Sequence, residues 1–181
     1  FRWIIDPIDG TSNFLHGIPH FCISIALEKE REIVAGLIFD PIKNELFSAE
    51  KGKGSFLNNK RIKVSARSNL NESLFLTGGP KSTSKTKDEI LQEYIRISKK
   101  INSPIRKSGS AALDLAFVAA GRCEVFWQRD INYWDMAAGI ILVKESGGFI
   151  TDLKGGNSYL NKKEILATNS NINSEFVDLI K

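Results

Sequence analysis

The chain contains 181 residues, of which 42% are hydrophobic and 25% are charged, and its formal net charge is +4. This length and composition predict one globular domain with a sizeable core, and they exclude a disordered chain. Apolar stretches such as residues 136–143 are shorter than the roughly 20 apolar residues of a membrane-spanning helix, so the sequence predicts no membrane span.

The first half of the chain contains short runs rich in Ile, Val and Phe that alternate with charged or glycine-containing turns. Such runs predict successive strands, and the Asn58-Asn59 pair predicts a tight hairpin turn near their end. We therefore expect an antiparallel meander. Its strands are predicted at residues 3–5, 21–28, 33–39, 45–49 and 55–57.

Helical and strand patterns alternate after the break at Gly78-Gly79-Pro80. Thr86 and Glu89 have the spacing of a capping box, and apolar residues at helical spacing predict an amphipathic helix over 86–101. The small apolar residues from 110 to 120 predict a buried helix that Gly121 ends. Further helices are predicted at 134–145 and 174–180, and further strands at 124–128, 149–152 and 165–167.

Strands followed by alternating helices and strands predict a layered α/β (α+β) fold. We expect one domain over residues 1–181. Within it, residues 1–80 would form the first sheet with the loop for metal and phosphate, and residues 81–181 a second α/β half. Cys22 and Cys123 lie in apolar contexts without metal-type spacing, so both are predicted to be buried free thiols in a reducing cytoplasm.

An acidic turn, Asp6-Pro7-Ile8-Asp9, follows the first predicted strand. Pro7 keeps Asp6 out of the helical region, so we expect a tight turn where both carboxylates and the Ile8 carbonyl converge. Two ionised carboxylates this close repel each other unless a cation lies between them. An all-oxygen set favours a hard cation such as Mg²⁺, and the alternative is a turn whose acids are incidental.

The residues after the acidic turn predict a phosphate cradle. Gly10 permits close backbone approach, and Thr11, Ser12 and Asn13 are typical helix N-cap residues, so residues 10–14 are expected to open a short helix. Free backbone N–H groups at a helix start bind phosphate. A metal site beside such a cradle is typical of a phosphatase.

A third acid, Asp135, falls in the first turn of the helix predicted at 134–145, where its charge complements the helix dipole. The small residues Ala137-Ala138-Gly139 that follow would let this helix pack closely against another element. Asp135 is therefore predicted to be either a simple helix cap or a third carboxylate of the cation site.

Three stretches of the chain carry a resemblance to a known family. WIIDPIDGTSNFLHGIPHFCISIAL resembles the first signature of the inositol monophosphatase family, and WDMAAGIILVKESGGFITD resembles its second, in the same order. SGSAALDLAFVAAGRCEVFW, between them, is similar to the family's substrate-side segment. The resemblance covers essentially the whole chain, and it implies an αβαβα sandwich and a Mg²⁺-dependent phosphomonoesterase.

The resemblance also implies roles for individual residues. The intact site would hold two to three Mg²⁺ ions. Asp9 and Thr11 would be catalytic, with the Thr11 hydroxyl orienting the attacking water and the Gly10 and Thr11 N–H groups binding phosphate. Metal ligands would be Asp6, the Ile8 carbonyl, Asp9 and Asp135. Substrate or phosphate would contact Asp9, Gly10, Thr11, Ser110, Ala111, Gln128 and Asp135.

The chain departs from the family pattern at two places. Gln128 stands where the family usually has a glutamate that contacts a substrate hydroxyl, so a preference for inositol itself is open. The family's metal-binding glutamate and a water-assisting acid lie ahead of the first signature, whereas this chain starts at Phe1. We therefore expect an N-terminally truncated form that is inactive or very weak by itself, exposes apolar surface and aggregates.

The expected substrate is inositol monophosphate or a similar small polyol or sugar phosphate. Alternatives are fructose 1,6-bisphosphate, a bisphosphorylated nucleotide, or a binding role in an RNA or transcription complex that the mildly basic charge would suit. Loop histidines His16 and His20 are predicted to hold backbone rather than to act in catalysis. The main prediction includes no nucleic-acid partner and no membrane, and it places the protein in the cytoplasm, with a homodimer as an open alternative to a monomer.

Overall fold

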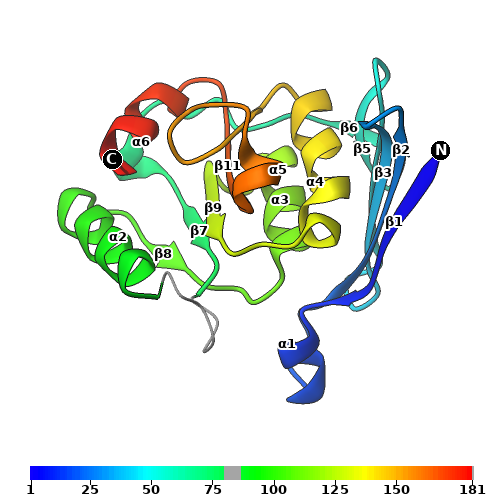
Figure 1. Cartoon of the computed structure of the whole chain (residues 1–181), viewed down its shortest axis with the longest axis horizontal. Coiled ribbons are helices and arrows are strands. Elements are labelled where there is room, and N and C mark those ends of the chain that lie inside the picture. The colour runs from blue at the N-terminus through cyan, green and yellow to red at the C-terminus, as the bar shows by residue number, and fades with distance from the viewer. Residues whose placement is uncertain (80–86, 181) are drawn as a thin grey trace.

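The computed structural model describes residues 1–79 and 87–180 of the chain. Figure 1 shows two sheets with helices between them and on one outer side. The first half contains β1 (Arg2–Asp9), α1 (Thr11–Leu15), β2 (Cys22–Lys29), β3 (Glu32–Asp40), β4 (Glu45–Glu50), β5 (Gly54–Leu57), β6 (Lys60–Ile62), the 3₁₀ turn η1 (Leu70–Glu72) and β7 (Phe75–Thr77). The second half contains α2 (Lys87–Lys100), β8 (Ile105–Arg106), α3 (Ala111–Ala119), β9 (Val125–Arg129), α4 (Tyr133–Glu145), β10 (Phe149–Thr151), α5 (Tyr159–Lys162), β11 (Glu164–Thr168) and α6 (Asn173–Ile180).

The first sheet is a six-stranded antiparallel meander in the order β1-β2-β3-β4-β5-β6, as predicted. Asn58 and Asn59 have positive φ angles of 47° and 64°, and they form the expected tight turn between β5 and β6. The predicted bounds of the first strand are wrong, because β1 continues through Pro7 to Asp9. Proline is tolerated there because β1 is an edge strand whose register shifts between Asp6 and Asp9.

The second sheet has the order β10-β11-β9-β7-β8. Its pairs β7–β8 and β7–β9 are parallel, whereas β10–β11 and β11–β9 are antiparallel. The sequence pattern did not predict β7, β8 or α5, which are only three, two and four residues long. Elements this short are too brief to show a hydrophobic period.

Helices α3 and α4 lie between the two sheets, and α2 and α6 cover the outer face of the second sheet (Figure 1). Side chains along β9 alternate between the two cores: Phe126 packs with α3 and α4, while Val125 and Trp127 pack with α6. The described elements form four of the five layers of the expected αβαβα sandwich, and the mixed α/β class is confirmed.

Close packing of α4 follows from its small residues, as predicted. A Cβ on Gly139 would lie only 2.4 Å from the Leu115 Cδ1 atom of α3. A Cβ on Gly36 of β3 would lie 2.9 Å from the Ala138 carbonyl oxygen. The helix therefore sits directly against both neighbours, and this fixes the position of its first turn.

The helix bounds agree closely with the expectations. α4 begins one residue earlier than predicted, at Tyr133, and α3 begins after Ser110. The Thr86 member of the predicted capping box lies outside the described residues. Cys22 and Cys123 are each 1% exposed, so the prediction of buried thiols is confirmed. None of the helices in the described part of the chain has the length and apolar character needed to span a bilayer.

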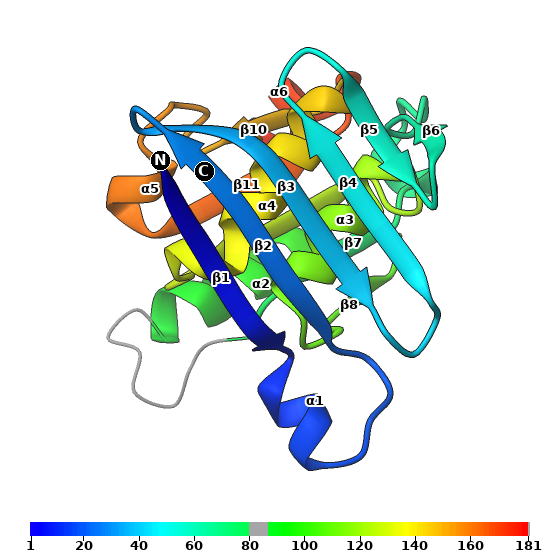
Figure 2. The ribbon, with the colours of Figure 1, turned by 90° about the vertical axis from the view of Figure 1, so that its right-hand side faces the viewer.

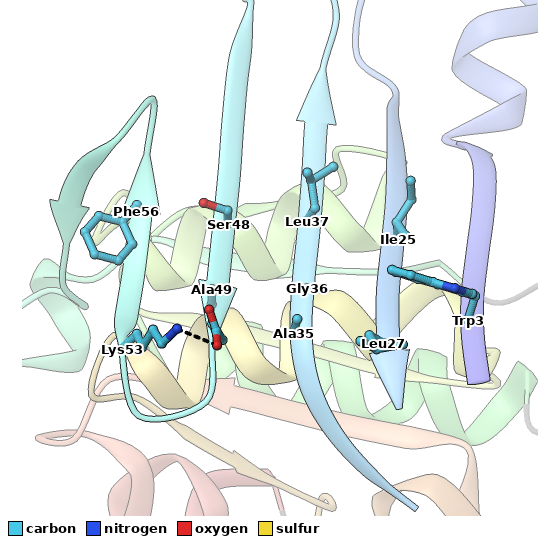
Figure 3. A pocket seen from close by; sticks show the side chains of 11 residues that line it. Trp3, Ile25, Leu27, Ala35, Gly36, Leu37, Ser48, Ala49, Lys53 and Phe56 are labelled. Carbon is cyan, nitrogen blue, oxygen red and sulfur yellow. Dashed lines mark ion pairs between the residues drawn. The ribbon is translucent and has the colours of Figure 1, made fainter. Parts of the chain in front are cut away.

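The outer face of the six-stranded sheet is open in the described structure, and Figure 2 shows no element in front of it. A shallow cavity of about 530 Å³ lies on this face, with Trp3, Ile25, Leu27 and Phe56 in its lining (Figure 3). Trp3 is 64% exposed. The expected exposure of apolar surface is thus confirmed, and aggregation remains a prediction.

Candidate active site

A polar cavity of about 490 Å³ lies where the end of β1 meets the first turns of α3 and α4. Its walls combine carboxylates, glycine backbone and polar side chains from segments far apart in the sequence. The lining residues are Asp6, Ile8, Asp9, Gly10, Thr11, Ser12, Gly78, Gly79, Gly109, Ser110, Ala111, Asp114, Gln128, Asn132, Trp134 and Asp135.

Three carboxylates meet in this cavity. Asp6, Asp9 and Asp135 each offer one oxygen, and these oxygens lie within 4.8 Å of one another. Asp9 and Asp135 are separated by 135 − 9 = 126 positions in the chain. The structure therefore brings together the three acids that the sequence analysis selected, and their roles as ligands stay a prediction.

The acidic residues lie at the end of β1, where the register with β2 shifts between Asp6 and Asp9, so the predicted tight turn at these residues is wrong and the chain turns at Gly10. The Ile8 N–H donates to Asp6 Oδ1 at 3.1 Å, and the Thr11 hydroxyl donates to the Ile8 carbonyl at 2.9 Å. Gly10 has a φ of +88°, and a Cβ there would lie 3.0 Å from the His20 carbonyl oxygen. Only glycine fits this position without strain. The turn thus holds the Ile8 carbonyl and the Thr11 hydroxyl at the wall of the cavity.

Asp9 is anchored to the first turn of α3 and is 8% exposed. Its Oδ2 accepts hydrogen bonds from the Ser110 hydroxyl at 2.6 Å and from the Ala112 N–H at 2.8 Å. Burial raises the pKa of Asp9 to about 6, although both hydrogen bonds oppose the shift, and the charges of Asp135 and Asp6 raise it further. The anchored carboxylate therefore carries an electrostatic strain that a cation would relieve.

Asp135 combines the two alternatives left open by the sequence. Its Oδ2 accepts from the Asn132 N–H at 3.0 Å and from the Asn132 side-chain amide at 3.2 Å, so it caps the start of α4. It also belongs to the cluster of three carboxylates. The cap fixes the side chain at the cavity wall, so both roles are compatible.

The other predicted site residues also line the cavity: Gly10, Thr11, Ser110, Ala111 and Gln128. A Cβ on Gly78 would lie 2.2 Å from Gln128 Oε1, so the Gln128 side chain packs directly on the Gly78 backbone. The side chain of the half-buried Gln128 is thereby placed at the cavity wall.

Two cavity residues escaped the sequence analysis although each has a clear place in the site. Asn132 holds Asp135, and the Asn-x-x-Asp capping pattern was the signal that could have revealed it. Asp114 is 2% exposed and accepts from the Ser108 hydroxyl. Burial raises the pKa of Asp114 well above its usual range. A lone acid inside an apolar helix gives no sequence signal of this position.

The two loop histidines are absent from the lining of the cavity. The ring of His20 packs against Phe117 at a centroid distance of 6.0 Å, and burial lowers the pKa of His20. The His20 carbonyl accepts from the Asn13 side chain. Because His20 Nε2 is buried without a hydrogen-bond partner in the described part of the chain, the structure does not support the prediction that its ring holds backbone, and the lack of a catalytic role stays a prediction.

The donor set fits Mg²⁺. Two oxygens bound to one Mg²⁺ lie at most about 4.2 Å apart, twice the metal–oxygen distance. In an octahedral site only one pair among three ligands can be opposite, and the other pairs lie about 3 Å apart. The three oxygens, which lie within 4.8 Å of one another, would therefore move closer together around one ion. All three ligand atoms are oxygens, which favours a hard cation over a thiophilic one.

The family model of the inositol monophosphatase family matches residues 1–180. The inositol-1-monophosphatase of Rhizobium meliloti is 46% identical over 180 residues, which are 99% of this chain and 67% of that relative. The Nus factor SuhB of Pseudomonas aeruginosa is 40% identical over 173 residues, which are 94% of this chain and 63% of that relative.

The crystal structure of extragenic suppressor protein suhB from Bartonella henselae has a TM-score of 0.94 to this chain at 48% identity. The match covers 99% of this chain and 69% of that chain. The chain thus spans about two thirds of the length of such relatives. Since the family model, the curated relatives and the fold agree over nearly all of its residues, the chain belongs to the inositol monophosphatase family.

Proposed function

We propose that the protein is a Mg²⁺-dependent phosphomonoesterase that hydrolyses inositol monophosphate or a similar small polyol phosphate. One observation carries this proposal: carboxylates from β1 and α4, far apart in the chain, place oxygens within 4.8 Å of one another. Like charges are held this close only where a cation or a proton offsets their repulsion. The family name of the curated relatives supports the phosphatase reaction.

In this proposal the cation is held by Asp6, Asp9, Asp135 and the Ile8 carbonyl. When bound, Mg²⁺ supplies Lewis-acid polarisation of the phosphate and neutralises charge in the transition state. Hydrogen bonds from Ser110 and Ala112 occupy Oδ2 of Asp9. Among the described residues Oδ1 of Asp9 has no hydrogen bond, so this oxygen is the one available to the cation.

The Thr11 hydroxyl would orient the attacking water. Its proton is donated to the Ile8 carbonyl, so its oxygen keeps a lone pair with which to accept a hydrogen bond from that water. The Gly10 and Thr11 backbone N–H groups at the same wall would bind the phosphate oxygens. An in-line attack by the oriented water would then release inorganic phosphate and the alcohol without a covalent enzyme intermediate.

The remainder of the cavity favours a small neutral leaving group. Its volume of about 490 Å³ lies in the range of small-molecule sites. Ser110 and Ala111 form one wall, and the Gln128 amide can hydrogen-bond a substrate hydroxyl without adding charge. Because a neutral amide stands where the family usually has a carboxylate, we expect a broader substrate range than inositol monophosphate alone.

Phosphate release by the complete protein, as its gene encodes it, tests this function. The substrates to compare are inositol 1-phosphate, glycerol 2-phosphate, fructose 1,6-bisphosphate and a 3′,5′-bisphosphorylated nucleoside, each with and without Mg²⁺. The proposal predicts Mg²⁺-dependent turnover that is fastest with the monophosphates. Faster turnover of the bisphosphorylated nucleoside, or turnover that persists in excess EDTA, would contradict it.

A second role is suggested by the curated relatives that are named Nus factor SuhB. Such a role would consist of binding within a transcription complex, and the net charge of +4 is compatible with an RNA-containing partner. The Asp9→Asn variant separates the two roles. It should lose phosphate release, whereas binding to a purified transcription elongation complex would survive if the second role is independent of the cavity.

A further inference from the structure

Asn13 is buried beside the cavity although it does not line it. It is 9% exposed and is the buried residue of the short helix α1, whose other residues are exposed. A buried amide is stable only when its polar atoms have partners. The partners of Asn13 therefore indicate what the residue holds in place.

Both amide hydrogens of Asn13 bridge to backbone from other segments. Nδ2 donates to the His20 carbonyl at 2.7 Å and to the Ser108 carbonyl at 2.9 Å. Ser108 lies 95 positions away, in the turn that leads into α3. One side chain thus connects the loop after α1, the start of β2 and the turn before α3.

The fit between Asn13 and this turn is tight. Gly109 has a φ of +92°, and a Cβ there would lie 2.8 Å from Asn13 Nδ2 and 3.0 Å from its Oδ1. Only glycine allows the backbone to approach the amide so closely. The turn therefore cannot slide past Asn13 without breaking both the contact and the hydrogen bond.

The same turn carries the group that holds Asp9. Ser110, one residue beyond Gly109, donates to Asp9 Oδ2 at 2.6 Å, and the Ala112 N–H donates to the same oxygen at 2.8 Å. Residues 10–12 therefore lie between two residues, Asp9 and Asn13, that are both bound to α3 or to the turn before it. Asp9 is attached to α3, and Asn13 is attached to the turn that precedes α3.

We propose that Asn13 is a positioning residue that locks residues 10–12 and the turn at 108–110 into one rigid wall of the cavity. The inference rests on the proposed function, because the wall serves the cation and the phosphate. Without the Asn13 bridge, the Gly10–Ser12 backbone would lose its side-chain link to the turn at 108–110, while Asp9 would stay attached to α3 and Thr11 to the Ile8 carbonyl. The cation would then meet Asp9 and the Ile8 carbonyl in a wider range of positions, and its affinity would fall.

The test compares Asn13→Ala and Asn13→Asp with wild type in the complete protein. Asn13→Asp keeps the size of the side chain but removes both donors and faces two carbonyl oxygens. Mn²⁺ binding by electron paramagnetic resonance and the Mg²⁺ concentration for half-maximal activity are the two readouts. We expect each to weaken by about 10-fold or more, as for other partners that orient metal ligands, with a larger loss in kcat than in KM.

Asn169 provides the matched control. It is 0% exposed, and its amide donates to the Arg67 carbonyl at 2.8 Å, outside the cavity. Asn169→Ala should lower the melting temperature as Asn13→Ala does but leave Mn²⁺ affinity unchanged. Asn13→Ser, which retains one donor, supplies the comparison if the alanine variant does not fold.

Wild-type Mn²⁺ affinity in Asn13→Ala and Asn13→Asp, or an equal loss in Asn169→Ala, would overturn the proposal. The readouts also separate it from the proposed function. A wild-type protein that binds Mn²⁺ but releases no phosphate would refute the phosphatase, while the Mn²⁺ comparison would still decide the role of Asn13. A wild-type protein that binds no Mn²⁺ would overturn both.

Discussion

Asp9 and Asp152 are both buried aspartates, but their surroundings differ. Asp152 is 2% exposed and accepts from the Lys162 ammonium at 2.6 Å and from the Gly156 N–H at 2.8 Å. Burial alone would raise the pKa of Asp152, but these partners outweigh it and lower the pKa to about 2. Asp9 accepts only from neutral groups among the described residues, and its pKa rises to about 6.

The charged groups around the two aspartates differ in the same way. Near Asp152, acids and cations are matched: Glu164 is bound to Arg129 at 2.7 Å, and Arg129 also pairs with Glu93 at 3.1 Å. Near Asp9, the two closest charges are Asp6 and Asp135, and both raise its pKa. Around Asp152, the buried acids are thus paired with lysine or arginine side chains of the fold itself. In the proposed function, the acids of the cavity would instead take their cation from solution.

The largest difference is expected in activity. Asp9→Asn should lower kcat/KM for phosphate release by at least about 100-fold, the upper end of what losing an outer partner costs at a metal site. Asp152→Asn should stay within about twofold of wild type, since Asp152 lies outside the cavity. Assays at saturating Mg²⁺ with inositol 1-phosphate measure both variants. A kcat/KM of Asp9→Asn that is a tenth of the wild-type value or more would contradict this expectation.

The second difference is in the pH dependence of stability. Asp9 has a folded pKa of about 6 and an ordinary value of 3.8, so between these pH values the folded state retains a proton that the unfolded state has lost. The free energy of unfolding of the metal-free protein should therefore fall as pH rises from about 4 to about 6, by at most about 3 kcal/mol.

Urea unfolding in EDTA at pH 4.5 and pH 7 measures this slope in wild type and in Asp9→Asn. The unfolding free energy of Asp9→Asn should lack the pH dependence that Asp9 contributes in wild type. At pH 7 the variant should be the more stable of the two metal-free proteins. Saturating Mg²⁺ should reverse the order, because a ligand that binds only the folded state stabilises it. If the unfolding free energy changes equally with pH in the two metal-free proteins, the pKa of Asp9 is not raised in the folded state.

Asp152→Asn should change stability in the opposite direction. The pKa of Asp152 is lowered to about 2 from 3.8, so its contribution is present above about pH 4 and is lost as pH falls through about 2. The variant should be less stable than wild type by about 2 kcal/mol at pH 7. Urea unfolding measures the deficit, which should shrink as pH falls from 4 towards 2, and a deficit independent of pH would contradict the assignment.

Lys162→Met should produce the smallest change. It removes the cation from Asp152, but the Lys162 side chain is 40% exposed, so solvent already screens the pair. We expect a stability loss of about 1 kcal/mol or less. The pKa of Asp152, measured by NMR titration of its carboxyl carbon, should rise. An unchanged pKa would mean that the Gly156 and Lys154 N–H groups alone hold it low.

Local pattern predicted much of the fold. The six-stranded meander follows from alternating apolar runs and from the Asn58-Asn59 turn, which involve neighbours in the chain. The extent of β1 could not be predicted, because Pro7 argues against a strand and only pairing with β2 keeps it extended. β7 and β8 are held by their positions in the second sheet rather than by their own sequences.

The acidic cluster was predicted in two different ways. The closeness of Asp6 and Asp9 is local, because the two residues are three positions apart at the end of β1, where the register with β2 shifts. The approach of Asp135 depends on the packing of α4 against both sheets, so the residue pattern left it open between a helix cap and a third carboxylate, and the family resemblance favoured the carboxylate. Asn13 has no sequence signal of its position, because the Ser108 carbonyl that it binds lies 95 positions away.

The fluorescence of Trp3 can report whether the open outer face of the six-stranded sheet is covered. Trp127 is 3% exposed inside the second core, whereas Trp3 is 64% exposed on the open face. Indole emission shifts to shorter wavelength when water leaves its surroundings. Anything that covers this face should therefore blue-shift the fluorescence of Trp3, and Trp3→Phe should abolish that shift while the emission of Trp127 and of the half-exposed Trp134 remains.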